Sequence, residues 1–210
     1  MNLTQLLAVV RQDLHDQDSS NYRWTDAELT RHINRAVAEL SESMPVPAKA
    51  IMATVEGSRE LDISALADRI MVAALEYPVG STPPDYQQFS IWGNTLTITS
   101  GSQPDGKNCT VYYGGPHTID GTGSTLPEKY LDLVAGGACG YAAAELALYT
   151  VNRVNAGGIK TSSDLLEWGN QKLVLFRQEL KRLGRRNRIR VSDLSPTFFP
   201  AASKNTDYGP

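Results

Sequence analysis

The chain has 210 residues, of which 41% are hydrophobic and 20% are charged, and its formal net charge is −3. This length suffices for one large domain or two small ones, with a core that needs no disulfide or metal. The small net charge excludes a protein whose whole surface is built to bind nucleic acid or an anionic membrane.

The N-terminus and the two cysteines bear on the compartment. The first residues lack the basic stretch and the long apolar run of a signal peptide. No apolar run reaches the length of a membrane-spanning helix, so we expect no membrane association. Cys109 and Cys139 lack a metal-binding spacing, and buried free thiols are favoured over a disulfide. These features predict a reduced, cytosolic compartment.

Residues 2–16 have the apolar spacing of an amphipathic helix. Asn2 suits the N-cap of this helix, and the polar residues 16–21 that follow are typical of a loop. The apolar face of the predicted helix consists of Leu3, Leu6, Leu7, Val10 and Leu14.

The stretch WTDAEL, which begins at Trp24, carries a dense helix-start signal. Thr25 as N-cap and Glu28 three residues later form a capping box. Trp24 and Leu29 take the two positions of a hydrophobic staple. The apolar stripe of the predicted helix is Leu29, Ile33, Ala36, Val37 and Leu40. The opposite, polar face carries Arg31, Asn34, Arg35 and Glu39.

From about residue 48 to residue 114 the apolar period changes from that of a helix to that of a strand. A turn at residues 56–59 predicts one hairpin, and Gly93-Asn94 predicts a second, tighter one. About five short antiparallel strands are expected without a βαβ rhythm. The alternating residues lie at 51–55, 61–63, 70–77, 89–91, 96–98 and 109–113.

A long helix is predicted to begin at Pro127 and to end near residue 152. Its centre, AGGACG at residues 135–140, is made of small residues. Each interior glycine costs roughly 1 kcal/mol relative to alanine, so we expect very close packing as compensation. A last helix is predicted over residues 164–183, ended by Gly184. The remainder contains three prolines and predicts an extended tail.

Catalytic and metal-binding motifs give little support for an enzyme. None of the three histidines has a spacing typical of a zinc site, and His32 is expected to be solvated or hydrogen-bonded. Asp13, Asp16 and Asp18 offer three carboxylates to a cation but lack the glycine and glutamate of a calcium loop. The end of a helix in an exposed turn explains them equally well. We predict no catalytic, cofactor-binding or metal-binding residue.

The most unusual composition lies in residues 181–190, where six of ten residues are basic and none is acidic. The dipole of the preceding helix accounts for the first two basic residues but not for the arginines after Gly184. Binding to a nucleic-acid backbone, docking on an acidic protein surface, and folding back on its own domain remain open. The pair Phe198-Phe199 favours a protein partner. The candidate residues are Arg185, Arg186, Arg188, Arg190, Phe198 and Phe199.

Three segments resemble the head–tail connector (adaptor) proteins of tailed bacteriophages. They are WTDAEL with INRA at residues 24–36, VYY at residues 111–113, and LPEKYLDLVA at residues 126–135. The order of elements is similar too: two helices, a β insertion, two helices and a tail. The resemblance implies an α+β fold in which an antiparallel helical bundle, residues 1–47 and 125–184, carries an antiparallel β region at residues 48–115. Residues 185–210 would form an extended C-terminal tail.

The same resemblance implies a structural protein of the virion neck, assembled in the host cytoplasm. Copies of it would form a ring, often a dodecamer, that lies under the portal protein and receives the tail or a tail-completion protein. DNA would pass through the ring without sequence-specific binding. The tail residues named above would bind the portal or a neighbouring subunit, and the polar face of residues 31–39 would contact another subunit.

Two other functions stay open on the sequence alone. One is a DNA-binding accessory protein that uses the basic run at residues 181–190. The other is a small hydrolase whose catalytic side chains converge only in the folded chain. The adaptor is the prediction we favour, because well-specified helices occur here without an active-site motif.

Overall fold

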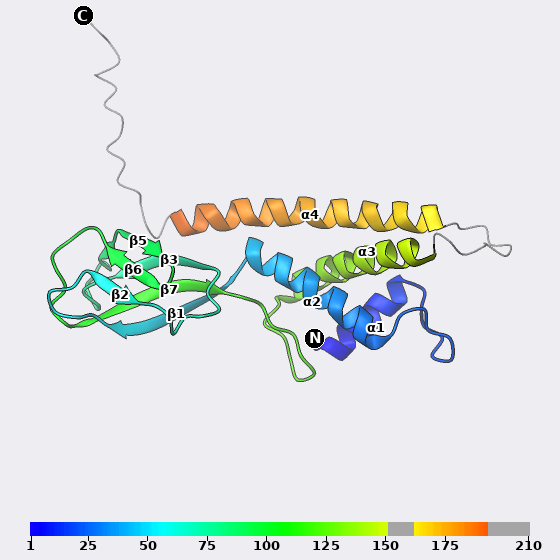
Figure 1. The fold of residues 1–210 in the computed structure, drawn as a ribbon, viewed down its shortest axis with the longest axis horizontal. Coiled ribbons are helices and arrows are strands. Elements are labelled where there is room, and N and C mark those ends of the chain that lie inside the picture. Colours follow the sequence, from blue (N-terminus) through cyan, green and yellow to red (C-terminus); the bar gives the residue numbers. More distant parts are fainter. Residues whose placement is uncertain (151–161, 193–210) are drawn as a thin grey trace, which may run out of the picture. The chain divides into compact units, whose positions relative to one another are not determined.

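The computed structural model describes residues 1–150 and 162–192, with side chains described as far as residue 188. The chain divides into two compact units (Figure 1). The helical unit comprises Met1–Val46 and Gly115–Arg185. The β unit comprises Pro47–Gly114 and the described residues from Arg186 onward. Within the described residues the helices are α1 (Leu3–Asp13), α2 (Asp26–Ser43), the short 3-10 helix η1 (Glu128–Tyr130), α3 (Leu131–Thr150) and α4 (Ser162–Ser192).

The starts of α1 and α2 agree with the sequence prediction. Asn2 and Thr25 are the N-caps, and each forms a complete capping box with the residue three positions on. Trp24 and Leu29 are both buried, and the Trp24 indole Nε1 also donates to the Ala142 carbonyl of α3 at 3.2 Å. The predicted staple residue therefore also joins α2 to α3.

The centre of α3 is buried on all sides. Seven consecutive residues, Gly137–Ala143, are buried, which is about two helical turns. α1 and α2 pack on α3, and α4 lies alongside it (Figure 1). In an antiparallel bundle each helix would keep an outward polar face. The predicted antiparallel bundle is therefore wrong: α1 and α2 run obliquely to a central α3, within a chain whose α+β class agrees with the prediction.

The small residues of α3 allow α4 to approach closely, as predicted. A Cβ atom added to Gly140 would lie 2.8 Å from Leu173 Cγ and 3.0 Å from the Gly169 carbonyl oxygen. A Cβ added to Gly137 would lie 3.0 Å from the Phe176 ring. The contact with α4 thus compensates for the low helix propensity of these glycines.

α4 continues through Gly184 as far as Ser192, so the predicted extended structure for residues 185–192 is wrong. Gly184 does not cap the helix. It lies beside the end of α2, where an added Cβ would be 3.8 Å from the Ser43 carbonyl oxygen. The arginines that follow are good helix formers, and Asn187 continues the buried side of the helix. Residues 193–210 lie outside the described residues.

The β unit contains two antiparallel sheets in the described part of the chain. The four-stranded sheet has the order β1-β7-β3-β4, with β1 Val46–Ala53, β7 Asn108–Gly115, β3 Met71–Glu76 and β4 Tyr86–Gln87. The three-stranded sheet has the order β2-β6-β5, with β2 Glu60–Asp62, β6 Thr95–Ile98 and β5 Phe89–Trp92. The apolar core of the β unit is separate from that of the helical unit and includes Ile63, Leu75, Leu96 and Val111.

One of the two predicted hairpins is present. Trp92 pairs with Thr95 around Gly93-Asn94, and Gly93 has a φ of +58°, a region that favours glycine. The hairpin predicted at residues 56–59 is wrong, because β1 joins the four-stranded sheet and β2 the three-stranded one. Seven strands occur within the described residues, compared with about five predicted.

Two expectations about the chain as a whole can be checked. Cys109 and Cys139 are free and buried, as predicted, and burial raises the pKa of Cys139 to about 12. The expectation that no segment reaches membrane-spanning length is wrong, since Glu128–Thr150 is long and apolar enough to cross a membrane by length and composition alone. Of its apolar 18-residue window, 61% is buried inside the protein, as in a core helix, because α1, α2 and α4 cover α3.

Candidate partner-binding surfaces

Asp16 of the first loop belongs to a buried ion-pair network, whereas Asp13 and Asp18 are exposed. Arg11 is buried, and its Nη1 lies 2.6 Å from Asp16 Oδ2. Its Nη2 lies 2.6 Å from Asp26 Oδ1 and donates to the Trp24 carbonyl at 2.9 Å. The Arg11 guanidinium also stacks 3.5 Å from the centroid of the Tyr22 ring. Asp16 therefore fixes the chain entering α2 rather than offering a free carboxylate to a cation.

Two of the histidines are buried in structural positions. His32 Nε2 lies 3.0 Å from Glu145 Oε2 without hydrogen-bond geometry, and burial lowers the pKa of His32. The expectation of a solvated or hydrogen-bonded His32 is therefore wrong. His117 Nε2 lies 3.0 Å from the Met44 carbonyl, and its Nδ1 lies 3.1 Å from the Thr125 carbonyl. This histidine ties the end of α2 to the chain that leads to α3.

Three of the four residues on the polar face of α2 have partners within the chain. Arg31 forms an ion pair with Glu145 of α3. The Arg35 guanidinium lies 3.9 Å from the centroid of the Tyr141 ring, and the Tyr141 hydroxyl donates to Glu39. Burial and the Glu39 carboxylate raise the pKa of Tyr141, which keeps its hydroxyl protonated as a donor. Asn34, the fourth candidate, is exposed.

The C-terminal part of α4 exposes a purely basic surface, which we call the basic face of α4. It consists of Lys181, Arg182, Arg185, Arg186 and Arg188. The buried side of the same turns carries Leu180, Leu183 and Asn187. Arg182 pairs with Glu179 at 2.6 Å, whereas the other four have no ionic partner among the described residues. The side chain of Arg190 and both Phe198 and Phe199 lie outside the described residues.

The three-stranded sheet presents a second exposed surface, which we call the acidic–aromatic face. Strand register places Trp92, Thr95 and Asp62 in one row across it, and Ser90, Thr97 and Glu60 in the next. Trp92 is 90% exposed. This surface was not predicted from the sequence, although Ser90 and Trp92 alternate along one strand with the apolar Phe89 and Ile91.

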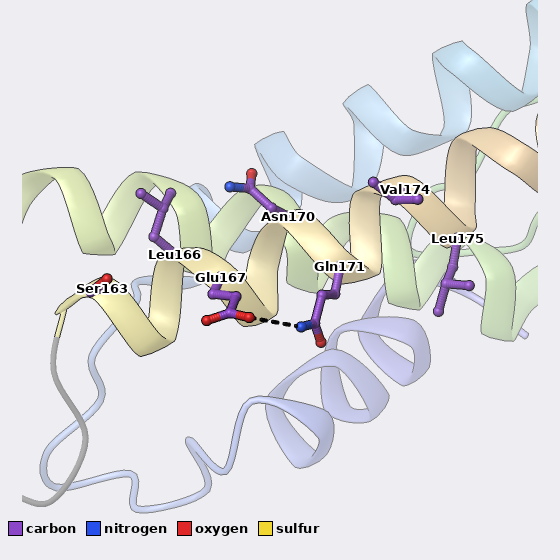
Figure 2. A pocket seen from close by; sticks show the side chains of 7 residues that line it. All are labelled: Ser163, Leu166, Glu167, Asn170, Gln171, Val174 and Leu175. Carbon is purple, nitrogen blue, oxygen red and sulfur yellow. Dashed lines mark hydrogen bonds between the residues drawn. The ribbon is translucent and has the colours of Figure 1, made fainter.

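The N-terminal half of α4 carries a third feature, an open hollow of about 620 Å³ (Figure 2). Its described lining comes from one helix: Ser163, Leu166, Glu167, Asn170, Gln171, Val174 and Leu175. Val174 and Leu175 are more than half exposed, and Gln171 Nε2 donates to Glu167 Oε1 at 3.3 Å. The two halves of α4 therefore differ: the first is mixed apolar and polar, and the second is basic.

The described residues present exposed charged and aromatic surfaces and contain no group of three or more His, Cys, Asp or Glu side chains that could hold a metal ion. The family model described as SU10 adaptor protein matches residues 1–194. The chain therefore belongs to the SU10 adaptor family, a family of phage adaptor proteins. The family is structural and virion-associated, and its members interact with other virion components. No curated protein matches the chain.

Proposed function

We propose that the protein is a structural head–tail adaptor that forms a ring under the portal of a tailed phage. The ring extends the DNA channel and joins the capsid to the tail. Its partners are the portal protein, a tail or tail-completion protein, and copies of itself in a dodecamer. It occupies the virion neck after assembly in the host cytoplasm. The observation that carries this proposal is the match to the SU10 adaptor family over residues 1–194, which spans both units.

Each part of the chain has its own task in this proposal. Residues 1–47 and 125–184 form the framework of the ring, and residues 48–115 are an insertion that offers a further surface. The end of the chain binds the portal or a neighbouring subunit through Arg185, Arg186, Arg188, Arg190, Phe198 and Phe199. On the polar face of α2, the exposed Asn34 offers a contact to another subunit, and Arg31, Arg35 and Glu39 flank it while they keep their partners on α3.

Two truncations test the docking role of the end of the chain. Ending the chain after Ser192 removes both phenylalanines but keeps α4 whole, and ending it after Gly184 also removes the last arginines. Both variants should fold like the full chain by circular dichroism, because the helical core is formed by residues before Gly184. Neither should attach to portal-bearing capsids when attachment is counted by electron microscopy. Attachment of the shorter variant at the level of the full chain would refute the docking role.

The basic face of α4 supports a second candidate function, a DNA-binding accessory protein. Its exposed arginines lack carboxylate partners among the described residues, so they are available to phosphates. Titration of a labelled duplex at two salt concentrations tests this. Binding that weakens steeply with salt, and that is lost when Arg185, Arg186 and Arg188 are replaced by glutamate, would support the DNA-binding protein. Absence of binding at low salt would exclude the DNA-binding protein and leave the structural adaptor as the proposed function.

A further inference from the structure

We propose that the basic face of α4 in one copy docks on the acidic–aromatic face of the three-stranded sheet in the next copy. This inference rests on the proposed ring and names the contact that closes it. The donor surface is centred on Lys181, Arg185 and Arg188, and the receiving surface on Glu60, Asp62 and Trp92.

The donor surface is a continuous stripe on a regular helix. Lys181, Arg185 and Arg188 follow each other at steps of four and three residues, which places them on one side of α4. At 1.5 Å per residue the stripe is about 10 Å long. All three side chains are exposed and have no ionic partner among the described residues. An exposed row of cations without an intramolecular ionic partner is available to an acidic partner surface.

The receiving surface matches this stripe in charge and in spacing. Glu60 and Asp62 are two residues apart on β2 and both exposed, so their side chains project from the same face about 7 Å apart. Basic residues one helical turn apart, such as Lys181 and Arg185, are separated by about 6 Å along the axis. Two ion pairs can therefore form at once. Trp92 lies in the same row as Asp62 but two strands across the sheet, roughly 10 Å away, where its ring is offered to the long side chain of Arg188, the third cation.

The structure also holds the receiving surface rigid. Arg69 Nη2 donates to the Gly93 carbonyl at 2.7 Å and to Asn94 Oδ1 at 3.0 Å. Its Nη1 donates to the Leu66 carbonyl at 2.9 Å, so the Arg69 side chain ties the turn next to Trp92 to the chain that follows β2. Asp62 accepts from the Ser64 backbone N–H at 2.8 Å, which lowers the pKa of Asp62 and keeps it ionised. A rigid surface loses little side-chain freedom on binding.

Charge complementarity selects a second copy as the occupant. The acidic face repels DNA and anionic membranes. It is attracted to a basic surface, and the basic face of α4 in a second copy is such a surface. Donor and receiver are different surfaces of one chain, so the contact is heterologous and, repeated around a closed rotation, generates a ring. An isologous contact would instead stop at a dimer.

Cross-linking between two single-cysteine variants tests the contact directly. Asp62→Cys and Arg185→Cys chains are purified separately, mixed in equal amounts, assembled on portal-bearing capsids and treated with a short bismaleimide. The native Cys109 and Cys139 are both buried, so they stay unreactive. The proposal expects a cross-linked dimer in the mixture and none from either variant alone. The matched control is Glu167→Cys, an exposed position on the other half of α4, which should give no dimer with Asp62→Cys.

A charge exchange tests whether the same contact contributes affinity. Asp62→Lys and Arg185→Glu should each weaken ring assembly at least about tenfold, which is about 1.4 kcal/mol. A chain that carries both substitutions should recover most of the loss. Trp92→Ala should weaken assembly as well, without a change in its salt dependence.

The outcomes separate this inference from the proposed function. Rings that assemble normally but give no Asp62–Arg185 cross-link would overturn the docking contact and leave the adaptor intact. A cross-link formed inside a single chain that carries both cysteines, with none between chains, would overturn it too. If the unaltered chain forms no ring on portal-bearing capsids, the proposed function fails, and this contact fails with it.

Discussion

The polar face of α2 and the basic face of α4 look alike in sequence, since both are rows of charged residues on a helix. In the structure they differ. Arg31 and Arg35 of α2 have partners on α3, in Glu145 and the Tyr141 ring. Arg185 and Arg188 of α4 have no ionic partner among the described residues. The comparison teaches that a charged helix face is a candidate binding surface only after its intramolecular partners are known.

The partners follow from the position of each helix. α2 crosses the central helix α3, so the edges of its apolar stripe reach α3 side chains such as Glu145 and Tyr141. α4 contacts α3 through its earlier part, at Gly169, Leu173 and Phe176. The turns after Leu183 have left that contact. Their charges therefore remain available for another molecule, while the charges of α2 mainly hold the fold together.

The largest expected effect concerns Arg11, a buried cation of the helical unit with two ion pairs. Arg11→Met leaves the buried Asp16 carboxylate without its ion-pair partner and should lower the free energy of unfolding by about 3–5 kcal/mol. Urea denaturation followed by circular dichroism measures this. The matched control adds Asp16→Asn to the same chain and should recover much of the loss. A loss in the free energy of unfolding below about 1 kcal/mol, as for a surface ion pair, would mean that the buried pairs of Arg11 stabilise the fold no more than exposed charges do.

The next largest effect concerns the contact between α3 and the earlier part of α4, which the later, basic part of α4 does not share. Gly140→Ala places a Cβ against Leu173 and the Gly169 carbonyl oxygen, so it should destabilise by about 1–3 kcal/mol. Gly136→Ala on the same helix is the control. Because nothing lies within 4 Å of its added Cβ, it should stabilise by about 0.5–1 kcal/mol. Equal effects in thermal denaturation would mean that α4 does not pack closely on α3.

The sequence predicted those parts of the fold whose cause is local. The capping box of Thr25 and Glu28 and the turn at Gly93-Asn94 are specified by a few adjacent residues, and both are present. The small residues of α3 predicted a close contact, which they make with α4. The small residues did not predict that α3 lies at the centre of the helical unit. That depends on how three other helices cover it.

The errors have a common physical cause in long-range packing. β1 and β2 flank a good turn, yet each finds its partner far along the chain, β1 in β7 and β2 in β6. Gly184 looks like a helix end, but contact with the end of α2 explains the glycine, and the helix continues. For the candidate surfaces, the basic residues were visible in sequence, whereas Asp62 and Trp92 come together only through strand register.

A double-mutant cycle on Arg31 and Glu145 sharpens the comparison at lower energy. Both side chains are at least half exposed, so the coupling energy should be only about 0.2–1 kcal/mol. It is measured by urea denaturation of Arg31→Ala, Glu145→Ala and the double variant at low and high salt. A coupling energy of zero in low salt would mean that the polar face of α2 is as free as the basic face of α4.

The smallest expected effect on stability belongs to the basic face itself. Because Arg185 and Arg188 have no ionic partner among the described residues, replacing both by glutamate should change the free energy of unfolding by less than about 0.5 kcal/mol. The matched control is Arg182→Glu, which removes the pair with Glu179 on the same turns. A larger loss for the double variant would reveal an intramolecular role for these arginines. Unchanged stability together with lost assembly would instead assign their charge to another molecule, since a side chain that does not support its own fold can lower assembly only through a partner.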